Sequence, residues 1–229
     1  MSRTLLIRHG QASFGAADYD CLSALGEEQS RRLGRWLKQA GHTADLVVLG
    51  TLRRHLQTAE LCLQAAGVTA PRIIAPGFDE FDHEEVLLRY RPDLSSIEAL
   101  MAELARSAAP QQEFQRMFSA AVARWTGGRF EHEYTRSWRS FHASVVTGMQ
   151  LLAAQEAGSI WVFSSGGPIA VIVNTLLGAP VADTFKLSWP LVNTSVSRIV
   201  TGAQRNALIS YNGWPHLEAA DAAAMISYR

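Results

Sequence analysis

The residues of this chain best suited to chemistry are a neighbouring cation and imidazole, Arg8 and His9, which follow the apolar run Thr4 to Ile7. Such a run, ending at a glycine-containing turn, predicts a buried strand that delivers its last residues to the carboxyl edge of an α/β sheet. An arginine can bind two phosphoryl oxygens while a neutral ring nitrogen attacks phosphorus. The alternative is a surface cation beside a hydrogen-bonded histidine, because Arg-His-Gly alone is a weak motif.

A second pair of cations, Arg53 and Arg54, stands at the start of a predicted helix that follows a predicted strand. Helix N-termini favour anions, so the dipole does not explain a cation there. An anion bound between the arginine and the free backbone N–H groups would explain it. The alternative is that both arginines are simply solvated.

Two further segments follow predicted strands. Residues 78–85 are dense in carboxylates, and a carboxyl close to a phosphate tends to keep its proton and can act as a general acid. An acidic helix start or a metal site stays open there, although no spacing selects a metal. Residues 164–167, Ser-Ser-Gly-Gly, predict an anion cradle of hydroxyl and N–H groups. They form neither a GxSxG elbow nor a P-loop.

The elements that must position these residues alternate along the chain. A helix over about 22–40, with Ser23 as N-cap, follows the first strand. Strands at 45–49 and 72–75 flank a helix at 52–66, and this βαβαβ order predicts a largely parallel sheet. Helical patterns at 96–106, 111–125 and 137–155 then predict an insertion over the sheet edge, whose apolar residues could equally be packing alone. Strands at 159–163, 193–200 and 207–211 complete the sheet.

Composition limits the remaining choices. The chain has 229 residues, which fits one large α/β domain, with two compact domains as the alternative. Its formal net charge of zero argues against nucleic acid or an anionic membrane as partners. Cys21 and Cys62 are isolated, which favours a reducing compartment. The first strand leaves no room for a signal peptide, and no apolar run reaches the ~18 residues of a membrane span. We therefore expect a cytoplasmic protein.

Four segments together resemble the histidine phosphatase superfamily, in the branch that includes the cofactor-dependent phosphoglycerate mutases. They are Leu-Ile-Arg-His-Gly-Gln at 6–11, Leu-Ser-Ala-Leu-Gly-Glu-Glu-Gln at 22–29, Leu-Arg-Arg-His-Leu-Gln-Thr-Ala-Glu at 52–60 and Val-Phe-Ser-Ser-Gly-Gly-Pro-Ile at 162–169. The resemblance implies an α/β fold of the phosphoglycerate mutase-like type, a three-layer α/β/α sandwich with a mostly parallel central sheet and a helical insertion over its carboxyl edge. Residues 1–229 would then form a single histidine phosphatase domain, with the insertion at about 84–155.

The resemblance also implies roles for individual residues. His9 would be the nucleophile that forms a phosphohistidine, Arg8 and Arg54 the phosphate clamps, and Glu80 the proton donor, with Asp79 and Asp82 as close alternatives. Ser165 and Gly166, in the predicted cradle, join the two arginines in binding phosphate. No metal and no other cofactor is implied.

Two positions depart from the family pattern. Ser165 stands where the family usually has a second histidine, and losing one preorganised donor typically costs about 100- to 1000-fold in rate. Gly166 and Gly167, or another histidine such as His83, His55 or His216, could replace it. Gly15 stands where mutase-type members often have asparagine, which weakens the mutase interpretation.

The sequence therefore predicts a metal-independent phosphomonoester hydrolase with a small-molecule phosphorylated substrate. The alternatives are mutase-type phosphoryl transfer and a catalytically weakened phosphate-binding or regulatory protein. The resemblance also allows a homodimer.

Overall fold

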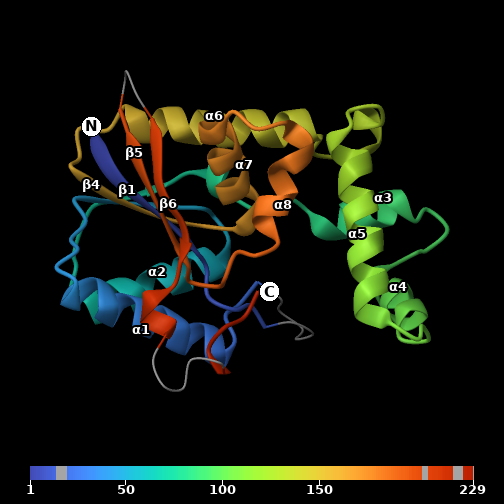
Figure 1. The fold of residues 1–229 in the computed structure, drawn as a ribbon, viewed down its shortest axis with the longest axis horizontal. Helices are drawn as coiled ribbons and strands as arrows, with labels where there is room; N and C mark the ends of the chain where they lie inside the picture. The colour runs from blue at the N-terminus through green and yellow to red at the C-terminus, as the bar shows by residue number, and fades with distance from the viewer. Residues whose placement is uncertain (14–19, 203–205, 219–223, 229) are drawn as a thin grey trace. The chain divides into compact units, whose positions relative to one another are not determined.

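The chain builds a sheet with helices on both faces (Figure 1). The computed structural model describes residues 1–13, 20–202, 206–218 and 224–228. Within these residues the sheet has six strands in the order β3-β2-β4-β1-β5-β6. The strands are β1 (Ser2–Arg8), β2 (Leu46–Leu49), β3 (Arg72–Ile74), β4 (Ser159–Ser164), β5 (Val196–Thr201) and β6 (Ala207–Gly213).

The strand directions confirm a mostly parallel sheet. β1 pairs with β4, β4 with β2 and β2 with β3, all in parallel, whereas β5 runs antiparallel to β1 and β6 antiparallel to β5. The register aligns Arg8 with Ser164, so that β1 and β4 end side by side. The residues that follow these two strands therefore share the carboxyl edge.

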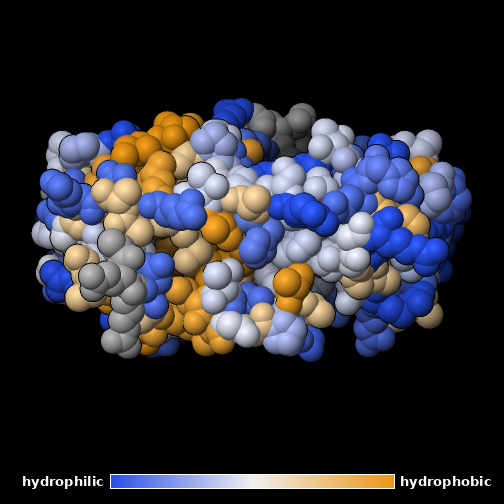
Figure 2. All heavy atoms as spheres, turned by 90° about the horizontal axis from the view of Figure 1, so that it is seen from above, coloured by the Kyte–Doolittle hydropathy of each residue, from blue (hydrophilic) through white to orange (hydrophobic). Residues whose placement is uncertain are grey.

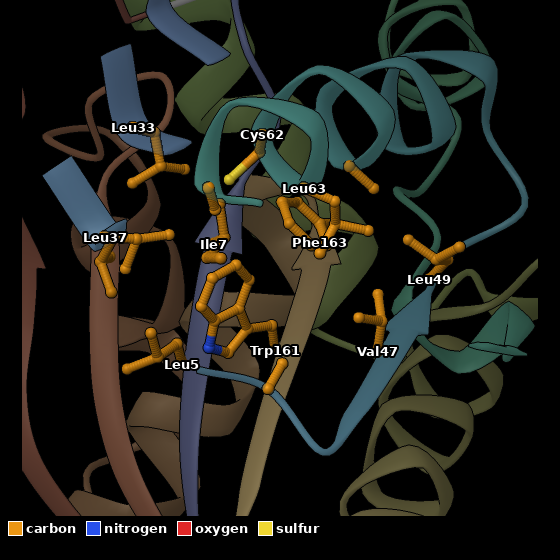
Figure 3. Close-up of a cluster of buried hydrophobic side chains, with 14 residues drawn as sticks. Leu5, Ile7, Leu33, Leu37, Val47, Leu49, Cys62, Leu63, Trp161 and Phe163 are labelled. Atoms are coloured by element: carbon orange, nitrogen blue, oxygen red, sulfur yellow. The ribbon is translucent and has the colours of Figure 1, made fainter. Parts of the chain in front are cut away.

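Helices α1 (Ala24–Gln39) and α2 (Arg53–Ala66) cover one face of the sheet. The predicted N-cap of α1 is confirmed, because the Ser23 side chain accepts a hydrogen bond from the Gly26 N–H at 3.1 Å. Figure 3 shows the apolar cluster that these helices bury against the strands. Its members include Leu5, Ile7, Leu33, Leu37, Val47, Leu49, Cys62, Leu63, Trp161 and Phe163.

The other face is covered by α7 (Gly166–Leu177) and by α6 (Trp138–Ala153) from Ser144 onward (Figure 1). Phe78 packs against Gly148 of α6, where an added methyl group would lie 3.1 Å from the phenyl ring. Helices on both faces make the three layers that the family resemblance implied. A short helix, α8 (Thr184–Ser188), follows α7 and was not foreseen.

The described residues divide into two compact units, one of residues 1–80 with 144–229 and one of residues 81–143. The second unit holds α3 (His83–Tyr90), α4 (Ile97–Leu104), α5 (Pro110–Thr126) and the start of α6. Its core is aromatic, with Phe81 stacked on Trp125 at 4.7 Å between ring centroids. The second unit overlaps the helical insertion expected at about 84–155, and the single-domain organisation stays a prediction.

The surface mixes polar and apolar residues. Figure 2 shows hydrophilic side chains over much of the face that it presents, with apolar residues between them. Among the described helices, none is both long and apolar enough to cross a membrane.

Candidate active site

His9 lies at the carboxyl edge, held by two neighbouring segments. Its backbone N–H donates to the Ser164 carbonyl of β4 at 2.9 Å. Its carbonyl accepts from the Thr194 N–H at 3.2 Å and from the Asn193 side-chain amide at 3.1 Å. Thr194 has a φ of 61°, a conformation that β-branched residues rarely adopt. The backbone at the end of β1 is therefore fixed on both sides.

The His9 ring is held as a neutral imidazole with one ring nitrogen free of a proton. Its Nδ1 lies 2.6 Å from the Gly10 carbonyl oxygen, which can only accept, so that Nδ1 carries the proton and Nε2 keeps its lone pair. Burial holds the pKa of His9 well below its usual range, and the positive charges of Arg54 and Arg8 act in the same direction. The residue is 6% exposed. It is accordingly a neutral imidazole around pH 7.

Arg8 is anchored by the end of the chain. Its Nη2 donates to the Tyr228 carbonyl at 2.9 Å, and its Nη1 donates to the Leu191 carbonyl. No sequence pattern indicates this anchoring, because the two partners are backbone carbonyls remote from Arg8 along the chain. The tail therefore fixes one of the two predicted phosphate clamps.

Arg54 lies in the first turn of α2 and is 8% exposed. Its Nη1 forms an ion pair with Asp20 Oδ1 at 2.7 Å, and the other oxygen of Asp20 accepts the Arg53 N–H at 2.7 Å. The N-cap residue of α2, Leu52, supplies no side-chain cap. A carboxylate of the protein thus occupies the place where the sequence suggested a bound anion.

A similar contact exists at the start of α7. Glu80 Oε2 accepts the Gly167 N–H at 3.1 Å. An added methyl group at Gly166 would lie 3.0 Å from Ser188 Oγ, 3.8 Å from Glu80 Oε2 and 3.9 Å from Arg8 Nε. Arg8, Glu80 and the first residues of α7 therefore surround one small region, as a phosphoryl-binding site requires.

His55 is the histidine that reaches Ser165. Its Nε2 lies 2.7 Å from Ser165 Oγ, and its ring centroid is 5.8 Å from that of His9. The sequence offered His83, His55 and His216 as candidates without choosing among them. His216 instead contacts Thr194 Oγ1 at 2.9 Å, and His83 belongs to the second unit.

The first unit thus gathers Arg8, His9, Arg54, Glu80 and Ser165 with Gly166 at one edge of the sheet. Sequence reasoning did not single out Asp20, whose signal is only a carboxylate at the end of a loop. The departure noted at Gly15 falls outside the described residues. No group of three or more His, Cys, Asp or Glu side chains among the described residues is placed to hold a metal ion.

Comparison with known proteins gives a family match over most of the chain. A model of the histidine phosphatase superfamily (branch 1) matches residues 4–213. A 2,3-bisphosphoglycerate-dependent phosphoglycerate mutase of Thermobifida fusca is 40% identical over 75 residues, which are 30% of this chain and 30% of that protein. This relative is therefore matched over less than a third of its length.

Solved structures resemble the chain over nearly its full length. An alpha-ribazole phosphatase from Shigella flexneri is 22% identical with a TM-score of 0.60, and the match covers 92% of this chain and 96% of that one. A phosphoserine phosphatase from Entamoeba histolytica, solved with 3-phosphoglyceric acid, is 20% identical with a TM-score of 0.58, covering 94% and 99%. At these identities the likeness shows a shared fold.

Proposed function

The chain belongs to the histidine phosphatase superfamily, and we propose that it hydrolyses phosphomonoesters through a phosphohistidine on His9 without a metal ion. The observation that carries this proposal is the state of His9. Its Nδ1 is committed to the Gly10 carbonyl and its pKa is lowered by burial and by two arginines. A buried, neutral imidazole with one free lone pair, within the electrostatic influence of two arginines, is suited to attack a phosphate ester.

In the first half-reaction, Arg8 and Arg54 orient the dianionic phosphoryl group for in-line attack by His9 Nε2. The nitrogen–phosphorus bond forms as the bond from phosphorus to the ester oxygen breaks. Glu80, in its protonated form, gives its proton to the departing oxygen, which leaves as an alcohol. The contact of Glu80 with the first turn of α7 supports this role, because it keeps the carboxyl beside the region where the phosphoryl group would bind.

In the second half-reaction, water hydrolyses the phosphohistidine. The Glu80 carboxylate accepts a proton from the water, whose oxygen attacks phosphorus while the nitrogen–phosphorus bond breaks. Inorganic phosphate leaves and His9 returns to its neutral state. Ser165 and the Gly166 N–H stabilise the equatorial oxygens in both steps, while the Gly167 N–H holds Glu80.

The first test is the hydrolysis of p-nitrophenyl phosphate from about pH 5 to about pH 8 with EDTA present. Wild type is compared with His9→Ala and with His132→Ala, a matched change at an exposed histidine of the second unit. We expect activity in wild type and in His132→Ala that survives EDTA and is lost in His9→Ala. Because the pKa of His9 is depressed, kcat/KM should not fall near pH 6.5 through protonation of the nucleophile.

Turnover that persists in His9→Ala contradicts the phosphohistidine route, and loss of turnover with EDTA contradicts metal independence. The similarity to a phosphoglycerate mutase gives mutase activity a specific test of its own. Interconversion of the two phosphoglycerates, dependent on 2,3-bisphosphoglycerate and faster than phosphate release, would replace the hydrolase proposal with a mutase.

A further inference from the structure

His55 is a buried histidine for which the reaction above has no use. It is the third residue of α2, its side chain is fully buried, and the Arg54 charge adds to burial in holding its pKa well below the usual range. A titratable ring enclosed at the edge of a candidate active site calls for a reason other than packing.

The sheet register brings His55 to the reacting groups. Arg8 is aligned with Ser164 on neighbouring parallel strands, so that the next residues, His9 and Ser165, point to the same face. This is the face that α2 covers, since Ile7 and Phe163 pack there against Cys62 and Leu63 (Figure 3). The first turn of α2 therefore places His55 beside both side chains, at 5.8 Å between ring centroids from His9 and at 2.7 Å from Ser165 Oγ.

The hydroxyl of Ser165 does not cap its own helix. Ser165 is the N-cap residue of α7, yet its side chain accepts no hydrogen bond from the first turn. Among the described residues, its Oγ instead pairs with His55 Nε2. This diversion leaves the N–H groups at the start of α7 open to an anion, which in this structure is the carboxylate of Glu80.

The surroundings of His55 place a proton on Nε2. Among the described residues Nδ1 has no hydrogen-bond partner, and a buried N–H without one costs about 1 to 3 kcal/mol. A neutral ring therefore keeps its proton on Nε2, where Ser165 Oγ accepts it. The Asp79 carboxylate lies 3.8 Å from Nδ1, beyond hydrogen-bond distance. Ser165 therefore receives a hydrogen bond and keeps its own proton to donate.

The site is shaped to hold this ring. A methyl group at Gly50 would lie 2.2 Å from His55 Nδ1 and 2.6 Å from Asp79 Oδ1, so that only glycine leaves room for both. Asp79 is fixed in turn by Thr51, whose N–H and hydroxyl donate to its two oxygens at 2.5 and 2.6 Å.

We propose that His55 is a positioning residue for phosphoryl transfer: it donates from Nε2 to Ser165 Oγ and so aims the Ser165 hydroxyl proton at an equatorial oxygen of the phosphoryl group on His9. The reaction in this inference is that of the proposed function, on which it rests. Its geometry rests on the contact between His55 and Ser165. No bond of His55 or Ser165 is made or broken. His55 acts through Ser165 and does not touch the substrate.

The test compares substitutions that keep or remove the donor at Nε2. His55→Phe fills the same space without a donor, whereas the side-chain amide of His55→Gln reaches the same place and keeps one. His42→Phe, at a histidine beyond the end of α1, is the matched control. Measurements are kcat and KM for p-nitrophenyl phosphate and the dissociation constant of orthovanadate, which mimics the five-coordinate transition state.

We expect His55→Phe to lower kcat about 10- to 100-fold and to change KM by less than about threefold, because the lost stabilisation acts mainly in the transition state. Orthovanadate affinity should fall with kcat, and His55→Gln should recover most of both. Ser165→Ala should abolish the effect of position 55, so that adding His55→Phe causes no further loss. If His55→Phe does not fold, His55→Asn replaces it, because its amide is too short to reach Ser165 Oγ.

Equal kcat and orthovanadate affinity in His55→Phe and wild type would overturn the inference, as would additive losses in the double variant. The proposed function fails separately, through a wild type that does not hydrolyse phosphomonoesters. In that event, a loss of orthovanadate affinity in His55→Phe that is absent from His42→Phe still supports the positioning of Ser165 by His55. Unchanged orthovanadate affinity in His55→Phe overturns it.

Discussion

Replacing Asp20 with asparagine is expected to tighten the binding of inorganic phosphate about fivefold, which corresponds to about 1 kcal/mol. Asp20 holds Arg54 at 2.7 Å and caps α2 through the Arg53 N–H at the same distance. A phosphate dianion that binds Arg54 must compete with this carboxylate. Removing the negative charge, while keeping an oxygen that can cap the helix, weakens the competitor and leaves α2 intact.

The magnitude follows from the burial of the pair. Unit charges about 4 Å apart attract by about 4 kcal/mol at an effective dielectric constant of about 20. The Asp20 side chain is 31% exposed and that of Arg54 9%, so solvent screens part of this attraction. The asparagine oxygen also retains a neutral hydrogen bond to Arg54. A net gain of about 1 kcal/mol for the incoming phosphate remains.

Isothermal titration with inorganic phosphate at low and at physiological salt measures this gain. Asp45→Asn is the matched control, because Asp45 accepts the Ser159 N–H at 2.9 Å at the opposite edge of the sheet. Unchanged or weaker phosphate binding in Asp20→Asn, with Asp45→Asn like wild type, would refute the reasoning. It would mean that Asp20 orients Arg54 for the ligand and does not compete with it.

Three other predictions concern the acid, the tail and the response to pH. Glu80→Gln should lower kcat by about 100-fold or more with an alkyl phosphate and by less with p-nitrophenyl phosphate, whose leaving group needs no proton; equal losses contradict the proton-donor role. Ending the chain at Met225 removes the Tyr228 carbonyl that holds Arg8. This truncation should raise KM several-fold with little change in kcat. An unchanged KM would show that the residues after Met225 do not position Arg8. Burial lowers the pKa of His216 from 6.5 to about 3, so the unfolded chain binds the proton first and the folded state loses stability as pH falls from 6.5 toward 3. At about pH 5 the loss of unfolding free energy amounts to about 2 kcal/mol, and His216→Gln should remove this loss. The measurement is urea unfolding at about pH 7.5 and about pH 5, and an unaltered pH dependence in the variant contradicts this assignment.

The sequence predicted best those features that depend on local pattern. The apolar run before Arg8 and His9 predicted β1, and the N-cap at Ser23 was correct because capping is decided within one turn of helix. Parallel pairing followed from the alternation of strands and helices. The antiparallel direction of β5 and β6 did not, because helix α8 between α7 and β5 is too short to leave a recognisable period.

The contacts within the site were harder to predict, because they depend on the sheet register. His55 reaches Ser165 from a different helix, 110 positions apart in the chain, and nothing in the pattern around either residue marks the contact. Asp20 contacts Arg54 and the Tyr228 carbonyl contacts Arg8 only in the folded structure, where a loop and the C-terminal residues lie beside the two arginines. The gathering of these side chains at the carboxyl edge was therefore predictable from residue identities, whereas the groups that contact them there were not.

The most direct test of the central proposal is to trap the phosphorylated protein. Wild type is mixed with substrate in the presence of EDTA, quenched within milliseconds, digested and analysed by mass spectrometry, with His9→Ala as the comparison. We predict an acid-labile, base-stable phosphoryl group on His9 that forms and decays at rates consistent with kcat and is absent from His9→Ala. A phosphoryl group on Ser165, or turnover with no label on His9 at any time, would contradict the account.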